Sequence, residues 1–218
     1  MNCACGCKGL WALAAAGIVG GAVVGAAVWE RAGSTPASTP AVTPVALNAE
    51  DAKPFEIDTV HSSVVYRIKH QDVAYFYGTF NDVSGTFFLN PAEPNKSVID
   101  VTIKVDSIDS RNDKRDAHLK NQDFFSATEF PTATFKSTGF SKTGESTWDV
   151  TGDLTIRGQT KPVTVQVTHT GQATGRRGEV AGVEAKFTFK RSDFGMNYMV
   201  GKGLGDEVTI MAGLEGGR

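Results

Sequence analysis

Apolar and polar residues alternate with a period of two through most of the chain that follows residue 54. Successive side chains of a β-strand point to opposite faces, so each alternating segment has one apolar face and one polar face, which is typical of antiparallel sheets. The alternating apolar residues are Ile99, Val101, Ile103 and Val105; Trp148, Val150, Leu154 and Ile156; Val163, Val165 and Val167; Phe187 and Phe189; and Val208 and Ile210. We count eight or nine strands in residues 55–214. Closing them into an all-β antiparallel barrel would remove their exposed edges.

Two interruptions of this pattern predict irregular structure. The apolar positions are even-numbered up to Phe80 and odd-numbered from Val83, which predicts a bulge or bend near Asn81-Asp82. Ser110 and Asp113 form an S-x-x-D start before the charged run RNDKRDAHLKN. This pattern predicts one helix, and we expect that helical insertion at one mouth of the barrel.

An uncharged apolar segment of membrane length, residues 10–29, precedes the predicted barrel. A helix of this length would be about 30 Å long, which matches the hydrocarbon core of a bilayer. Lys8 precedes it, and Trp11 and Trp29 lie near its ends, as interfacial anchors do. We therefore expect a membrane anchor, with residues 1–9 as a cytoplasmic tail. The alternative is a cleaved signal peptide, for which Gly25-Ala26-Ala27 offers small residues.

Glycines within the apolar segment follow the pattern GxxxGxxxG at positions 17, 21 and 25, which is compatible with a homodimer of packed helices. Residues 30–54 contain Pro36, Pro40, Pro44 and Pro54 among Ser, Thr and Ala, and we interpret them as a semi-stiff linker.

The three cysteines, Cys3, Cys5 and Cys7, all precede the apolar segment, so the barrel itself contains no disulfide. A lipoprotein signal would need its cysteine after that segment. Three thiolates on a short tail also make an incomplete zinc site.

The predicted barrel lacks the usual signs of catalysis. A Cys–His pair is excluded, no G-x-S-x-G elbow occurs, and the histidines at positions 61, 70, 118 and 169 have no metal-ligand spacing. The segment Gly201–Gly205 lacks the full spacing of a phosphate loop. The net charge of −2 gives no general attraction to nucleic acid. We expect no enzyme activity, no metal and no cofactor.

Thirteen phenylalanines and three tryptophans could fill a solid core or line a cavity, since an eight-stranded barrel can do either. From their strand parity, we expect seven residues to face one apolar interior: Ile103, Val105, Phe135, Trp148, Val150, Phe187 and Phe189.

Four segments resemble the YceI-like, polyisoprenoid-binding family, in the order in which that family has them. They are FEIDTVHSSVVYRIKH, SIDSRNDKRDAHLKNQDFFSATEFPTATFKST, VTGDLTIRGQTKPV, and FKRSDFGM with GDEVTI. The resemblance covers nearly all of residues 55–210, and its most specific parts are K-R-D-x-H-L at residues 114–119 and TIRGxTKPV at residues 155–163.

The resemblance implies an extended lipocalin-like barrel with a long apolar tunnel, exported to the periplasm, without established catalytic residues. It implies binding of isoprenoid chains, quinone tails or fatty-acid-like lipids. We therefore expect lipid carriage or storage at the bacterial cell envelope. The alternatives are an accessory protein that presents a quinone to a membrane redox partner, and a structural envelope protein without a ligand. The glycine-rich end GLEGGR suggests a looser last strand.

Basic residues near the predicted helix and strand ends are candidates for the polar end of the ligand. They are Arg111, Lys114, Arg115 and His118 on the helical segment, and Arg157 and Arg191 elsewhere. Arginine suits phosphate oxygens, so these residues could bind an isoprenoid pyrophosphate. The alternative is structural: Arg115 and Arg191 could pair with Asp116 and Asp193.

Overall fold

The computed structural model describes residues 53–176 and 178–218. The predicted tail, the apolar segment 10–29, the linker up to residue 52 and all three cysteines lie outside the described residues. In the part of the chain that the structure describes, no helix is long and apolar enough to span a membrane.

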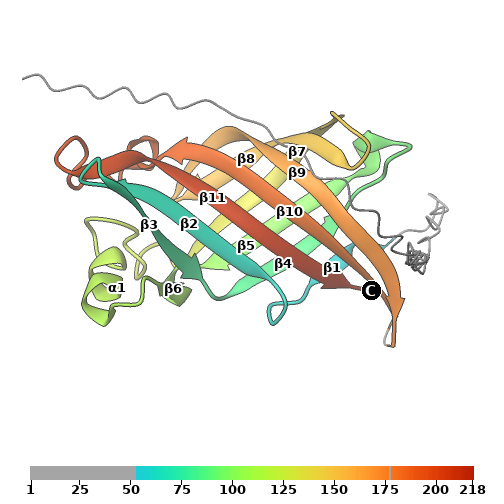
Figure 1. Cartoon of the computed structure of the whole chain (residues 1–218), viewed down its shortest axis with the longest axis horizontal. Coiled ribbons are helices and arrows are strands. Elements are labelled where there is room, and N and C mark those ends of the chain that lie inside the picture. Colours follow the sequence, from blue (N-terminus) through green and yellow to red (C-terminus); the bar gives the residue numbers. More distant parts are fainter. Residues whose placement is uncertain (1–52, 177) are drawn as a thin grey trace, which may run out of the picture. The chain divides into compact units, whose positions relative to one another are not determined.

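Eleven strands form a single antiparallel sheet (Figure 1). They are β1 (Phe55–Ile57), β2 (Ser63–His70), β3 (Ala74–Phe80), β4 (Val83–Phe88), β5 (Val98–Lys104), β6 (Ile108–Asp109), β7 (Thr132–Lys142), β8 (Thr147–Ile156), β9 (Gln159–Gly175), β10 (Gly178–Lys190) and β11 (Leu204–Gly217). The sheet is accompanied by α1 (Asp113–Leu119) and by the short 3₁₀ helices η1 (Pro94–Lys96), η2 (Val105–Ser107) and η3 (Arg191–Phe194).

The sheet closes into a barrel because β1 pairs with both β4 and β11. β1 and β2 both pair with the same edge of β11, so they are two segments of one strand line. β3 and β4 are likewise two segments of one line, and β5 and β6 are two segments of the next, since β4 pairs with β5 and β3 pairs with β6. These three broken strands and the five continuous ones make eight strand lines around the barrel. The prediction of a closed, antiparallel, lipocalin-like barrel of about eight strands is therefore confirmed.

Both predicted interruptions are present. The chain leaves β3 after Phe80 and enters β4 at Val83, so the break falls at Asn81-Asp82 as predicted. The helix begins at Asp113, but its N-cap is Asn112, whose side chain accepts a hydrogen bond from the Arg115 amide. Ser110 does not cap the helix as the S-x-x-D pattern suggested, because its amide and hydroxyl both donate to Asp116 Oδ1.

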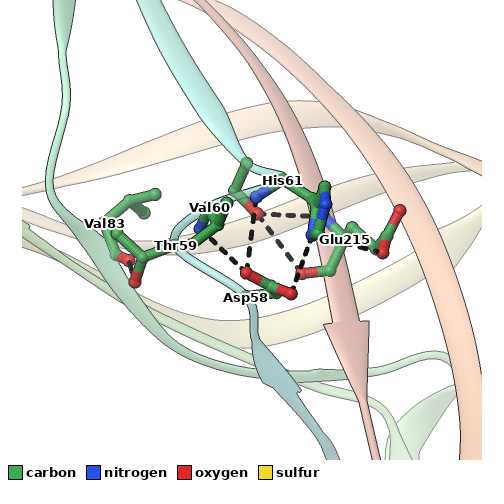
Figure 2. A network of polar contacts seen from close by, with 7 residues as sticks. Asp58, Thr59, Val60, His61, Val83 and Glu215 are labelled. Atoms are coloured by element: carbon green, nitrogen blue, oxygen red, sulfur yellow. Dashed lines mark hydrogen bonds and ion pairs between the residues drawn. The ribbon is translucent and has the colours of Figure 1, made fainter.

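A polar network holds the break between β1 and β2 (Figure 2). Asp58 accepts hydrogen bonds from the His61 ring at 2.9 Å and from the Val60 amide at 2.8 Å, and these bonds, the first most strongly, lower the pKa of the Asp58 carboxyl. Ser62 and the Glu215 backbone exchange two hydrogen bonds, so the loop is tied to β11. The network lies on the outside of the barrel, and none of its side chains lines the interior cavity.

One end of the barrel, which we call the packed end, is filled with side chains. Phe55 stacks on Phe87 with ring centroids 5.6 Å apart, and Trp148 and Val150 belong to the same buried cluster. Gly216 fits here only because it lacks a side chain, since a Cβ would lie 2.8 Å from Phe87 Cε1 and 2.9 Å from Phe55 Cβ. The glycine-rich last strand therefore closes the barrel tightly, and it runs to Gly217 rather than ending at residue 214.

The barrel is complete within the described residues. Every strand pairing lies within residues 55–217, and the described residues belong to one compact unit. Because this unit contains the whole core and a sheet without free ends, we infer that it folds by itself.

Candidate functional site

A cavity of about 480 Å³ lies inside the barrel between the packed end and α1. Its wall consists mainly of inward-facing apolar side chains from β2, β3, β5 and β7 to β11, among them Ile68, Val101, Val165, Phe187 and Ile210. These residues occupy alternate positions on their strands, which is the geometric result of the period-two sequence pattern. The volume is in the range of small-molecule pockets.

The predicted interior residues separate into two groups. Ile103, Phe135, Phe187 and Phe189 line the cavity. Three others do not line it. Trp148 and Val150 are buried in the same apolar cluster as Val64 and Ile68 of the cavity wall, toward the packed end, whereas Val105 is buried in η2 after β5 has ended. Strand parity identified the inward side of the barrel correctly, but it carried no information on the position along the barrel axis.

Figure 1 shows α1 at one end of the barrel. The cavity opens at this end, where its lining includes exposed side chains. Exposed residues of the β2–β3 turn and of residues 197–203 line this opening, which we call the mouth. His118, Phe124 and Tyr198 form a cluster of edge-to-face rings there, with centroids 5.0 to 5.4 Å apart. His118 Nε2 also lies 2.9 Å from Asp123 Oδ2. The ring cluster joins the segment after β6 to the loop before β11.

Arg191 lines the cavity as a buried side chain bound to backbone oxygens. Its guanidinium donates to the carbonyls of Gly205 at 2.8 Å, Met196 at 2.6 Å and Leu204 at 3.4 Å. Burial lowers the pKa of Arg191, and nearby Asp206 acts in the opposite direction. The proposed pairing with Asp193 is wrong, since these three carbonyls are the hydrogen-bond partners.

Arg115 is also held by its surroundings. Its guanidinium lies 4.3 Å from the centre of the Phe76 ring and donates to the Ser110 hydroxyl at 2.8 Å and to the Ser110 carbonyl at 2.5 Å. Asp116 binds the amide and hydroxyl of the same serine. Arg115 and Asp116 therefore meet through Ser110 and form no direct ion pair.

The structure brings only some of the head-group candidates to the cavity. Arg115, His118 and Arg191 line it, whereas Arg111, Lys114 and Arg157 do not. Arg157 donates to the Gly195 carbonyl at 2.8 Å. Arg111 has a positive φ, and its backbone amide donates a hydrogen bond to Asp109 Oδ1. The first group could reach a ligand at the mouth, while the hydrogen bonds of Arg111 and Arg157 serve the fold.

The sequence and structure can be compared with known proteins at this point. The family model of the YceI-like domain matches residues 55–215. A UPF0312 protein of Azotobacter vinelandii is 37% identical over 159 residues, which cover 72% of this chain and 82% of that relative. The chain belongs to the YceI-like family.

Solved structures agree with the YceI-like fold. The barrel resembles the crystal structure of Burkholderia cenocepacia BcnA with a TM-score of 0.66 and 27% identity, over 73% of this chain and 98% of that one. It also resembles a polyisoprenoid binding domain from Saccharophagus degradans, with a TM-score of 0.59 over 75% of this chain and 98% of that one. The identity to the latter is 12%, so this likeness shows the fold alone.

The YceI-like barrel also contains cavity residues that the sequence analysis did not select. Tyr66 on β2 lies between Val64 and Ile68, and the alternation of these three residues could have identified it. Burial, together with the charge of Asp116, raises the pKa of Tyr66 to about 12, and its hydroxyl has no hydrogen-bond partner among the described residues. Met196 and Tyr198 belong to a loop without periodicity, so no sequence signal indicated them.

Proposed function

We propose that the YceI-like barrel binds the long apolar chain of an isoprenoid, or of a related amphiphilic lipid, in its interior cavity. The observation that carries this proposal is the apolar cavity of about 480 Å³, enclosed by side chains from most strands of the barrel. Transfer of each CH₂ group from water into such a cavity contributes about 0.8 kcal/mol. A prenyl chain could therefore bind tightly without specific polar contacts.

The distribution of polar groups supports one orientation of the ligand. The basic side chains on the cavity wall all belong to α1, η3, the end of β2 or the loop before β11. They are His70, Arg115, His118, Arg191 and Lys202. We therefore orient the apolar chain toward the packed end and the head group toward the mouth. The similarity in fold to the polyisoprenoid binding domain from Saccharophagus degradans supports the same class of ligand.

We propose a role in lipid carriage or storage rather than in catalysis. None of the described aspartates and glutamates lines the cavity, and Asp123, whose Oδ2 lies 2.9 Å from His118 Nε2, is not among the lining residues. Arg191 and Arg115 are already bound to backbone or serine oxygens. A second candidate is an accessory protein that presents a quinone to a membrane redox partner, because a quinone tail has the same apolar character.

We place this function at the bacterial cell envelope, with the barrel on the periplasmic side of the cytoplasmic membrane. The support is the uncharged segment 10–29, followed by the proline-rich linker. Sequencing the N-terminus of the mature protein tests this placement. An intact N-terminus in the membrane fraction supports an anchor, whereas a start near Val28 in the soluble fraction indicates a cleaved signal peptide.

Mass spectrometry of an organic extract of purified Ala46–Arg218 tests the binding function. We expect one class of long-chain lipid in near-stoichiometric amount, and saturable rebinding of a fluorescent prenyl lipid after delipidation. A quinone in the extract would favour the accessory role. No extractable lipid and no rebinding would contradict the proposal and favour a structural envelope protein.

A further inference from the structure

We propose that the mouth of the cavity docks onto a lipid bilayer through exposed apolar side chains that surround the opening. These side chains are Val73 in the β2–β3 turn and Tyr198 and Met199 in the loop before β11, which we call the rim. The inference rests on the proposed function, because a water-insoluble chain can pass from a bilayer into the barrel without crossing water only if the mouth contacts the bilayer.

The exposed apolar side chains of the described residues are concentrated near this end of the barrel. Six large hydrophobic residues are exposed, and five of them lie on β3, in its preceding turn or in the loop before β11: Val73, Tyr75, Tyr77, Tyr198 and Met199. Val73 at the tip of the β2–β3 turn is 84% exposed. The sixth residue is Val60, in the break between β1 and β2. Exposed apolar residues that cluster around an opening indicate a surface that binds a partner.

The two loops of the rim lie together and border the cavity. The Gln71 amide donates to the Gly203 carbonyl at 2.6 Å, which joins the β2–β3 turn to the loop before β11. Gln71, Met199 and Gly203 also line the cavity. A membrane that contacts the rim would therefore face the cavity opening directly.

The neighbouring strand surface has the composition of a membrane interface. Tyr75 and Tyr77 are exposed on β3, and their cross-strand partners on β2 are Lys69 and Arg67. The Arg67 guanidinium lies 4.3 Å from the centre of the Tyr75 ring. Tyrosines and basic residues favour the head-group level of a bilayer, and apolar tips such as Val73 favour the layer below it. This arrangement fits a lipid surface better than a flat protein partner.

Flotation of Ala46–Arg218 with vesicles of equimolar phosphatidylethanolamine and phosphatidylglycerol tests the proposal. We expect the protein to float with the vesicles, and Val73→Gln to reduce the bound fraction about tenfold by removing an inserted apolar side chain. Val73→Phe should increase binding about threefold, which shows that the effect does not come from misfolding. Val60→Gln and Val60→Phe are matched controls, because Val60 is 85% exposed outside the rim, and both should leave vesicle binding unchanged.

Two results would overturn the docking proposal while leaving lipid binding intact. One is a protein that rebinds the fluorescent prenyl lipid but does not float, or that loses flotation equally with changes at Val60 and Val73. The other is a dimer in solution that Val73→Gln dissociates, measured by light scattering, since the rim would then bind a second copy of the chain. Absence of prenyl lipid binding in the unmodified protein would instead contradict the proposed function.

Discussion

Ala185 on β10 lies directly opposite Ala212 on β11 in the antiparallel ladder, and both residues line the cavity. The inward-facing pairs on either side of them are larger, namely Val183 with Leu214 and Phe187 with Ile210. The two alanine side chains thus leave space on a wall where larger side chains would fill the barrel. A cavity at this level is a consequence of small residues on two neighbouring strands.

The change Ala185→Phe should block ligand binding without unfolding the barrel. The added ring enters existing space, and burial of a phenylalanine side chain contributes about 1.5–3 kcal/mol, so the ligand-free protein should be as stable as the original or more stable. Rebinding of a fluorescent prenyl lipid should fall about tenfold or more. The control is Lys186→Phe, since Lys186 is exposed and faces outward. A loss of folding in Ala185→Phe would indicate a solid core.

The change Val150→Trp should have the opposite consequence. Val150 is fully buried in the packed end and does not line the cavity, so a larger side chain has no space to occupy. Overpacking of such a position costs about 1–3 kcal/mol or more. Thermal unfolding by circular dichroism should show a lower Tm, whereas an unchanged Tm with loss of bound lipid would mean that the cavity extends into the packed end.

The change Gly216→Ala should weaken the closure of the barrel. Its Cβ would lie within 3.0 Å of Phe87, Phe55 and the Glu56 carbonyl oxygen, and we expect a loss of about 1–3 kcal/mol in the free energy of unfolding. Gly213→Ala on the same strand is the matched control, because its nearest contact would be 4.0 Å away. The control should be neutral or stabilising by up to about 1 kcal/mol. Urea unfolding followed by fluorescence of Trp148, the single tryptophan of Ala46–Arg218, measures both.

The fold was predictable from the sequence because strand alternation is a local property. The parity change between Phe80 and Val83 placed a break correctly, and the alternation from Trp148 to Ile156 matches the burial of β8. The helix was predicted, but its cap was not, since Asn112 and Ser110 both have side chains that can bind a backbone amide. Asp116 decides between them, because it accepts the hydrogen bonds of the Ser110 amide and hydroxyl.

The site was less predictable because its position depends on the barrel axis and on loops. The sequence alternation predicts that both Trp148 and Phe187 face inward, but only Phe187 borders the cavity. Arg191 is a charged residue that the sequence alone would place at the surface. The structure buries it, and three backbone carbonyl oxygens accept the hydrogen bonds that its guanidinium would otherwise donate to water. No local pattern indicates that residues 196–205 turn back to supply those carbonyls.

The change Tyr66→Phe should increase stability at high pH. The pKa of Tyr66 is raised to about 12 from an ordinary value of 10.0, so the folded protein retains a proton that the unfolded chain loses first. Stability from this group is therefore complete below pH 10 and decreases as the pH rises from about 10 to 12. The Tm should fall less between pH 9 and pH 11 in Tyr66→Phe than in the unmodified protein. Equal decreases would contradict the assigned pKa.

Two changes, at Arg191 and at His118, separate structural from ligand-binding roles at the mouth. Arg191→Lys keeps the positive charge but cannot donate to the Gly205 and Met196 carbonyls with a planar guanidinium. Each buried carbonyl left without a donor costs about 1–3 kcal/mol, so Arg191→Lys should lower the Tm nearly as much as Arg191→Ala. Full rescue by lysine would show that charge alone is needed.

His118→Gln should leave the barrel folded, because His118 is partly exposed and its polar contact with Asp123 lies at the surface. If the mouth binds an anionic head group, this change should reduce affinity for a prenyl pyrophosphate about tenfold, and affinity for an uncharged prenyl alcohol by much less. Titration of delipidated Ala46–Arg218 with both ligands measures the difference, and circular dichroism checks the fold. Equal losses for the two ligands would assign His118 to the ring cluster with Phe124 and Tyr198, and would leave apolar burial as the basis of recognition.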